Sequence, residues 1–298
     1  MTNAGPFLTI VVANYNYGRY LAMALESVFS QSCKDYELIV VDGGSKDNSV
    51  DVIREHAGKE LSVDGNWHQC EKLTWISEKD QGQSDAFNKG FSKAHGKFLT
   101  WLNADDLMLD DAIEMLKNAA AEYPGQEWFA AGSVHFNYDG RVVRCVRTRH
   151  LSKYALSCGI ITLYSPSSFF TKRLYDSVGG MDLFFQYTMD TNLWARFYTL
   201  ENKCFKILPG YVFGFRYHPL SKTAGGYFDE KSPEQREKEE RQVAAERLKS
   251  SLLFKNLQKP NRLSLLLHID WKTKICNFLD TRRYKGKMMN ACVFNQKS

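Results

Sequence analysis

The sequence predicts an α/β fold in which helices flank a mostly parallel central sheet, followed by a C-terminal helical extension. Strand-like and helix-like segments alternate over the first 125 residues. The strand-like segments are near-continuous apolar runs, as in parallel strands covered on both faces. From Arg241 onward the chain has 13 Lys and Arg against 3 Asp and Glu, whereas the first 240 residues have 26 against 31. We therefore expect one domain at 1–225, with halves at about 1–125 and 126–225, and a basic extension at 226–298.

Each element of the first half has a local signature. Apolar residues at Leu21, Leu25 and Val28 have helical spacing. Asp47 or Asn48 is a plausible helix cap. The β-branched and aromatic runs predict strands at 7–13, 36–42, 73–78 and 97–103, and the periodic segments predict helices at 19–31, 47–57, 83–95 and 109–123.

The second half is less regular. Residues 128–147 predict a hairpin around Asp139-Gly140. Residues 165–180 predict a capped helix that stops at Gly179-Gly180. A further helix is expected at 189–202 and a strand at 204–218.

Composition excludes several classes of protein. The N-terminal apolar run is short and breaks at Asn14, so we expect neither a signal peptide nor a spanning helix. Seven scattered cysteines without a CxxC pair favour a reducing cytoplasm over a disulfide frame or a zinc site. Because the basic excess lies in the tail, it does not predict nucleic-acid binding by the main domain.

Polar clusters follow each predicted strand of the first half: "NYNYGR", "DGGSKD", "SEKDQGQSD" and "NADD". Ligands of open parallel sheets bind beyond the carboxyl ends of the strands. We therefore expect four aspartates to converge there on Mg²⁺ or Mn²⁺ that bridges to a phosphorylated ligand: Asp42, Asp80, Asp105 and Asp106. The chain has no GxGxxG or GxxxxGK[ST] loop, which disfavours a dinucleotide oxidoreductase or a P-loop NTPase.

Four blocks together resemble the family 2 glycosyltransferases of the Rossmann-like GT-A fold, over about residues 7–220. They are "TIVVANYNYGRYLAMALESVFSQ", "ELIVVDGGSKDNSV", "SEKDQGQSDAFNKGFSKAHGKFLTWLNADD" and "GGMDLFFQYTMDTNLWARF". The resemblance implies an inverting, metal-dependent transfer of a sugar from a nucleoside-diphosphate sugar, with a UDP-sugar favoured. The implied acceptor is a hydroxyl of a saccharide or lipid-linked saccharide, in cell-surface polysaccharide or glycolipid synthesis.

The resemblance also implies roles for particular residues. Asp190 is the implied general base, and Asp105 and His218 are the implied metal ligands. The implied nucleotide-binding residues are Ala13, Tyr15, Asp42, Asp80, Asn103 and Asp106. Asn103 replaces the first acid of the DxD motif, and Met189 stands where an acid commonly precedes the base.

Simpler interpretations stand beside these. Asp105 and Asp106 could cap the following helix, Asp42 could open a Gly-Gly turn, and Tyr17 is interpreted as aromatic packing. His218, beside a proline, would then be exposed and inert. Rival functions are a non-catalytic nucleotide-sugar-binding protein and a sugar nucleotidyltransferase.

Two interpretations of the basic C-terminal extension are also open. It could pack on the domain or on a second subunit of a homodimer. Alternatively, it could attach the protein peripherally to an anionic membrane at the cytoplasmic face.

Overall fold

The structure is a computed structural model of the chain. The structure describes residues 5–58, 68–70, 73–149, 163, 165–200, 205–221 and 271–289, with single positions at 234, 237, 238, 241, 242 and 246. Most of the expected C-terminal extension, including 247–270, therefore lies outside the described residues.

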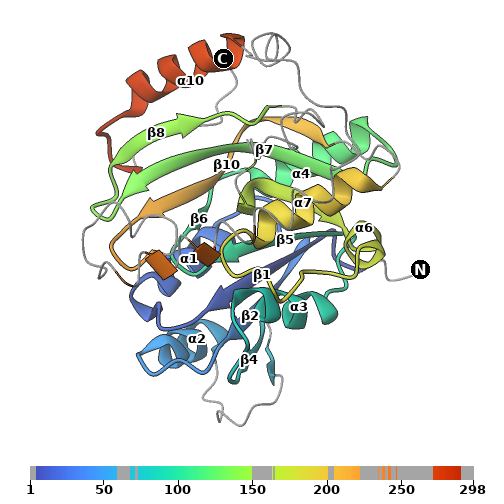
Figure 1. Cartoon of the computed structure of the whole chain (residues 1–298), viewed down its shortest axis with the longest axis vertical. Helices are drawn as coiled ribbons and strands as arrows, with labels where there is room; N and C mark the ends of the chain where they lie inside the picture. Colours follow the sequence, from blue (N-terminus) through green and yellow to red (C-terminus); the bar gives the residue numbers. More distant parts are fainter. Residues whose placement is uncertain are drawn as a thin grey trace.

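The first half forms the predicted parallel sheet (Figure 1). Strand β1 (Leu8–Asn14) lies between β2 (Tyr36–Asp42) and β5 (Phe98–Asn103), and β4 (Thr74–Ser77) continues beyond β2; all these pairs are parallel. The short strand β3 (His68–Gln69) adds an antiparallel edge on β4. All seven residues of β1 are buried, as the apolar run predicts for a strand covered on both faces.

The second half extends the same sheet in mixed directions. The order is β3-β4-β2-β1-β5-β9-β7-β10-β6, and β8 pairs with β7 off this path. The added strands are β6 (Leu107–Met108), β7 (Trp128–Asn137), β8 (Val142–Val146), β9 (Ser168–Thr171) and β10 (Lys206–Tyr217). Strands β7 and β8 form the predicted hairpin, and β10 runs parallel to β7.

One expected element has a different structure. The segment 165–180 was expected to be helical throughout, but it begins with a 3₁₀ turn, η1 (Ser165–Ser167), and continues as strand β9 before helix α6 (Lys172–Ser177). Strand β9 pairs antiparallel with both β5 and β7 and so joins the two halves of the sheet. Phe169 and Phe170 point to opposite faces and are fully buried in different core clusters. Residues 168–171 therefore form a strand rather than a helix, because pairing with β5 and β7 buries both phenylalanine rings.

Helices cover both faces of the sheet. On one face, α1 (Gly18–Phe29), α2 (Ser49–Ala57) and α4 (Ala112–Glu122) pack on Ile10 and Val12. On the other, α3 (Gln83–Ser92), α6 and α7 (Met189–Thr199) pack on Val11 and Ala13. Successive side chains of β1 thus point to opposite faces of the sheet and pack into two separate hydrophobic cores.

Three tryptophans form the centre of the core beneath α7. Trp194 stacks on Trp101 with ring centroids 5.4 Å apart and on Trp128 at 5.3 Å. All three side chains are fully buried. Because Trp194 belongs to α7, this stack fixes the helix against β5 and β7.

Helix α10 (Trp271–Tyr284) covers the open edge of the hairpin, above β8 in Figure 1. The N–H of Cys145 donates to Thr281 Oγ1 at 3.0 Å, and the N–H of Arg147 donates to Asn277 Oδ1 at 2.8 Å. These side chains satisfy donors that an edge strand otherwise leaves unpaired. Of the helices in the described part of the chain, none is long and apolar enough to cross a membrane.

Candidate active site

Strand register brings polar residues together at the carboxyl end of the sheet. In the pairing of β1 with β2, Asn14 lies beside Asp42, and in the pairing with β5, Ala13 lies beside Asn103. Asp42 in turn lies beside Ser77 of β4. The expected alignment of strand ends is therefore present.

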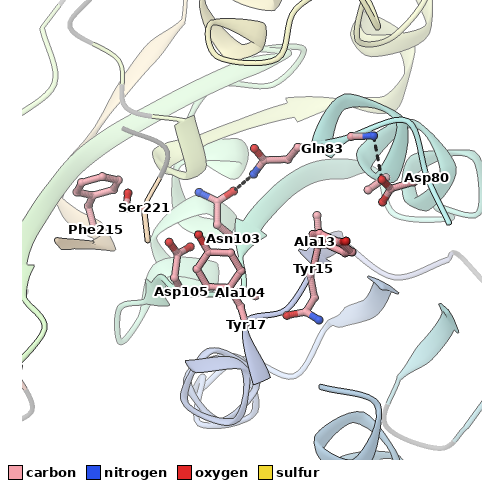
Figure 2. Close-up of a pocket in the computed structure, with 13 residues that line it drawn as sticks. Ala13, Tyr15, Tyr17, Asp80, Gln83, Asn103, Ala104, Asp105, Phe215 and Ser221 are labelled. Atoms are coloured by element: carbon pink, nitrogen blue, oxygen red, sulfur yellow. Dashed lines mark hydrogen bonds between the residues drawn. The ribbon is translucent and has the colours of Figure 1, made fainter. Parts of the chain in front are cut away.

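A cleft opens at these strand ends (Figure 2). Its volume, including open solvent at the mouth, is about 810 Å³. Its lining residues are Ala13, Asn14, Tyr15, Tyr17, Asp80, Gly82, Gln83, Ala86, Asn103, Ala104, Asp105, Phe215 and Ser221. Five residues singled out in the sequence are thus brought together here: Ala13, Tyr15, Asp80, Asn103 and Asp105.

Asp42 lies beneath the cleft rather than on its wall. Its carboxylate is fully buried and accepts hydrogen bonds from the Asn14 amide at 2.6 Å and the Ser77 hydroxyl at 2.5 Å. It also accepts from the N–H groups of Gly44 and Ser45 and from the Ser45 hydroxyl. Asp42 therefore holds the loops that follow β1 and β2, which carry Tyr15 to the mouth of the cleft.

The adjacent acids after β5 point to different environments. Asp106 is buried and accepts from the Asn103 amide at 2.7 Å and from the N–H of Arg216 at 3.0 Å. Asp105 lines the cleft, and its Oδ2 lies 2.8 Å from Nε2 of His218. Burial, and then the neighbouring charge of Asp105, raise the pKa of the Asp106 carboxyl well above its ordinary value. Repulsion between the two carboxylates is thus reduced, because Asp106 is buried in hydrogen bonds within the protein while Asp105 faces the cleft.

The expectation that four aspartates converge on one ion is wrong. Within the described ranges, no group of three or more His, Cys, Asp or Glu side chains is placed to hold a metal. Asp42 and Asp106 are instead directed into protein hydrogen bonds, which satisfies carboxylates that burial would otherwise penalise.

His218 is fully buried, contrary to the exposed position expected beside a proline. Its ring contacts Tyr20 at 4.7 Å and Tyr17 at 5.6 Å between centroids. The Tyr17 hydroxyl donates to the carbonyl of Leu220 at 2.7 Å, which holds the segment after β10 against α1. Tyr17 was interpreted as packing only, but it also lines the cleft.

Gln83 and Arg216 are site residues that sequence reasoning missed. Gln83 donates to Asn103 Oδ1 at 2.7 Å (Figure 2), so the Asn103 amide is held from both ends. Arg216 donates from Nε to the carbonyl of Asp105 at 2.8 Å, and its guanidinium lies 4.6 Å from the Phe136 ring centroid. The position of Gln83 could have been predicted, because it begins the helix that follows the third predicted strand. No local pattern predicts the role of Arg216, since its partner Asp105 lies more than a hundred positions earlier in the sequence.

Asp80 closes the other end of the cleft. Its carboxylate accepts from the N–H of Gly82 at 2.9 Å, on the opposite side from Asp105 in Figure 2. Burial raises the pKa of the Asp80 carboxyl above its ordinary value. A carboxyl of this kind is suited to accept hydrogen bonds from a ligand's N–H or hydroxyl groups.

Asp190 lies in the first turn of α7 and is half-buried. Its carboxylate accepts from the N–H of Thr191 at 2.6 Å. It is not part of the cleft wall, although the preceding residue, Met189, accepts from the hydroxyl of Ser84 next to that wall at 3.3 Å.

Asp105 and His218 fit a divalent cation that is completed by a ligand. Nε2 of His218 and Oδ2 of Asp105 are 2.8 Å apart, within direct hydrogen-bond distance of each other. This separation is also close to the roughly 3 Å between two neighbouring ligands of an octahedral ion with bonds of about 2.1 Å. Mg²⁺ and Mn²⁺ commonly take one or two protein ligands and complete their shell with phosphates and water.

Comparison with known proteins identifies the fold and the family. Residues 9–129 match the family model of glycosyl transferase family 2. This segment belongs to that family. An uncharacterized glycosyltransferase of Nostoc sp. is 41% identical over 100 residues, which are 34% of this chain and 28% of that protein. The chain aligns with less than two thirds of the length of the curated relatives it matches first.

Solved proteins share the GT-A fold of this chain. Staphylococcus aureus TarS 1–349 in complex with UDP-GlcNAc superimposes with a TM-score of 0.57 at 14% identity, over 90% of this chain and 77% of that one. The mannosyltransferase PcManGT of Pyrobaculum calidifontis, in complex with GDP-Man and Mn²⁺, gives a TM-score of 0.52 at 15% identity, over 94% and 85%. The α/β fold with its central sheet flanked by helices is thereby confirmed.

Proposed function

We propose that this protein is an inverting glycosyltransferase that moves a sugar from a nucleoside-diphosphate sugar to an acceptor hydroxyl. The observation that carries the proposal is the cleft, in which Asp80 lies at one end and the Asp105–His218 pair at the other. The cleft also opens to solvent at its mouth, where a ligand can enter. Solved proteins of the same fold were captured with UDP-GlcNAc and with GDP-Man, which supports the class of donor.

The nucleoside half of the donor is assigned to the Asp80 end. Asp80 accepts hydrogen bonds from the base or ribose there, and Ala13 leaves room at the strand end. Tyr15 is 57% exposed at the mouth, where its ring is available to stack on a base. Asp42 and Asp106 act through the loops they hold, and Asn103 acts as a neutral hydrogen-bonding group.

The diphosphate half is assigned to the other end of the cleft. Asp105 and His218 would hold Mg²⁺ or Mn²⁺, which offsets the charge of the leaving diphosphate. The buried guanidinium of Arg216, bonded to the Asp105 carbonyl, fixes the carboxylate-bearing loop in place.

Asp190 is assigned as the general base. It accepts the proton of the acceptor hydroxyl as that oxygen forms a bond to the anomeric carbon. The bond from the anomeric carbon to the phosphate oxygen breaks on the opposite face, and the nucleoside diphosphate leaves with the electron pair. The anomeric configuration is therefore inverted. The acceptor class proposed is a cell-surface saccharide or its lipid-linked form.

The test is a donor screen read as release of nucleoside diphosphate, with and without added Mn²⁺. We expect one donor to be turned over, and chelation to lower the rate. Tight binding of nucleotide sugars with no release or transfer under any condition would favour a non-catalytic binding protein. Formation of a nucleotide sugar from a sugar 1-phosphate would favour a nucleotidyltransferase.

We also propose that the outer face of α10 binds an anionic membrane surface. The only carboxylate of this helix, Asp280, is directed inward, where Arg147 Nε donates to it at 2.8 Å and the Tyr211 hydroxyl donates as well. The outer face carries Phe278 and Leu279, 63% and 54% exposed. Next to them are the exposed cations Arg282, Arg283, Lys285 and Lys287. Exposed apolar side chains beside clustered cations complement an anionic bilayer.

Flotation of the full chain with vesicles tests this surface. We expect binding to phosphatidylglycerol vesicles, weak binding to phosphatidylcholine, and loss of binding in Arg282→Glu but not in Lys93→Glu, a matched charge reversal at the C-cap of α3. Equal flotation of both variants, or association of protein copies through this face without lipid binding, would overturn the membrane assignment.

A further inference from the structure

The segment in front of α7 is held by a carboxylate from the C-terminal extension. Glu246 is fully buried. Its Oε1 accepts from the N–H of Gln186 at 2.8 Å, and its Oε2 accepts from the N–H groups of Tyr187 and Thr188 at 3.1 and 2.8 Å. The Thr188 hydroxyl and the Gln242 amide each add a bond at 3.0 Å. Five donors thus converge on one carboxylate.

This contact replaces a local helix cap. Thr188 occupies the N-cap position of α7, but its side chain makes no capping bond to the helix. The consecutive N–H groups of Gln186, Tyr187 and Thr188 are satisfied by a residue about sixty positions further along the chain. A carboxylate at this end also complements the helix dipole.

The same segment contacts the wall of the cleft. A Cβ added to Gly82 would lie 2.3 Å from Oε1 of Gln186, so the Gln186 side chain packs directly against Gly82. The Ser84 hydroxyl donates to the carbonyl of Phe185 at 2.7 Å. Gly82 is a lining residue, and Asp190 follows two positions after Thr188. Glu246 is therefore linked to the cleft wall and to α7 through one short segment.

We propose that Glu246 is a positioning residue that fixes the 186–190 segment, and with it Asp190, for transfer. The part concerning transfer rests on the proposed function; the part concerning the segment does not. Small displacements of a reacting group lower turnover more than they lower ground-state binding of the donor. Loss of Glu246 should therefore act on kcat and leave donor affinity near that of the wild type.

Glu246→Gln tests the proposal, because it keeps the shape but places an amide N–H₂ against backbone donors. Glu237→Gln is the matched control: Glu237 lies in the same extension and pairs with Arg241 at the surface. We expect hydrogen exchange at 186–188 to accelerate in Glu246→Gln only, and kcat to fall about tenfold or more with donor Kd changed less than about threefold. Gln242→Ala, which removes one of the five donors, should show a smaller increase in exchange if Glu246→Gln does not fold.

Exchange and turnover separate the outcomes. Unchanged exchange at 186–188 in both Glu246→Gln and Gln242→Ala would overturn the contact itself. Faster exchange with the kcat of the Glu237→Gln control would overturn the positioning role. If the wild type transfers no sugar at all, the proposed function fails, and exchange alone still decides whether Glu246 holds the segment.

Discussion

The adjacent carboxylates of Asp105 and Asp106, just after β5, have different environments: one lines the cleft and the other is buried in the protein. Asp106 is bonded to Asn103 and to the backbone of β10, so it ties the loop to the extended sheet. Asp105, one residue earlier, lines the cleft and contacts His218. Because burial raises the pKa of the Asp106 carboxyl, the repulsion between Asp106 and an ionised Asp105 is reduced.

Asp190→Asn should separate binding from chemistry. The amide cannot accept the acceptor proton, so transfer should fall by about a hundred- to ten-thousand-fold while donor Kd changes less than about threefold. Steady-state transfer and donor titration measure the two effects. Asp176→Asn on the exposed face of α6 is the control, and wild-type turnover by Asp190→Asn would reject the base assignment.

His135 should make stability fall at acidic pH. Burial, and then the charge of Arg144, lower the pKa of His135 to about 3. Arg144 donates to its Nδ1, so its Nε2 carries the hydrogen and donates to Ser133. The unfolded chain binds a proton near pH 6.5 and the folded one does not, so this contribution is complete above 6.5 and lost as the pH falls toward 3.

Urea unfolding between pH 7 and 4 measures this effect. The free energy of unfolding should lose about 1.4 kcal/mol per pH unit from this residue, and His135→Gln should flatten the slope. His95→Gln, at an exposed histidine, is the control. Equal slopes in the wild type and His135→Gln would show that His135 does not titrate in this way.

The sequence predicted the cleft residues better than their roles. Ala13, Tyr15, Asp80, Asn103 and Asp105 line the cleft because each lies at or just beyond the end of a strand whose position is fixed by register. That Asp42 turns away from the cleft depends on donors from Ser45 and Ser77, which local patterns do not reveal. Glu246 had no sequence signal, since its partners are remote in the chain.

At the scale of elements, α3 sets the width of the cleft through its approach to β1. Gly90 lies against Val11, and a Cβ there would come within 2.4 Å of Val11 Cγ1. The same helix carries Gln83 and Ala86 on the cleft wall. The close approach therefore links a packing constraint in the core to the position of the site.

Gly90→Ala should destabilise the protein although alanine favours helices. The gain in helix propensity is about 1 kcal/mol, but overpacking against β1 costs about 1–3 kcal/mol and forces α3 outward. Chemical denaturation measures the change, and Ser92→Ala on the exposed side of α3 should stay within about 0.5 kcal/mol of wild type. Stabilisation by Gly90→Ala would contradict the close contact.

The elements also show where local patterns are insufficient. Near-continuous apolar runs sufficed for β1, β2, β4 and β5, because each is a local signal for a strand covered on both faces. Strand β9 was expected to be helical, and only its position between β5 and β7 makes it a strand. Tertiary pairing decided the structure of a segment whose local preference was weak.

At the scale of the molecule, the C-terminal extension is part of the folded domain at two places. Helix α10 bonds the edge of β8, and Glu246 bonds the entry to α7. The tail was expected either to pack on protein or to meet a membrane, and α10 does pack on the hairpin through its inner face. Its outer face remains the proposed lipid contact.

Removing residues 271–298 should therefore expose the edge of β8. The freed N–H groups of Cys145 and Arg147 would make an open strand edge, which favours pairing between copies of the protein. We expect a lower Tm and concentration-dependent association by light scattering. Deletion of 290–298 alone keeps α10 and is the control; an unchanged Tm in the longer deletion would show that α10 adds nothing to the fold.

The central claim is tested most directly by the binding of UDP and GDP with and without Mn²⁺, measured by calorimetry. For the wild type and for Asp110→Asn, a control between β6 and α4, Mn²⁺ should tighten the binding of one nucleotide at least about tenfold, or about 1.4 kcal/mol. For Asp105→Asn, that dependence on Mn²⁺ should disappear. If neither nucleotide binds the wild type, or if Mn²⁺ tightens binding equally in Asp105→Asn, the cleft is not the metal-dependent diphosphate site described above.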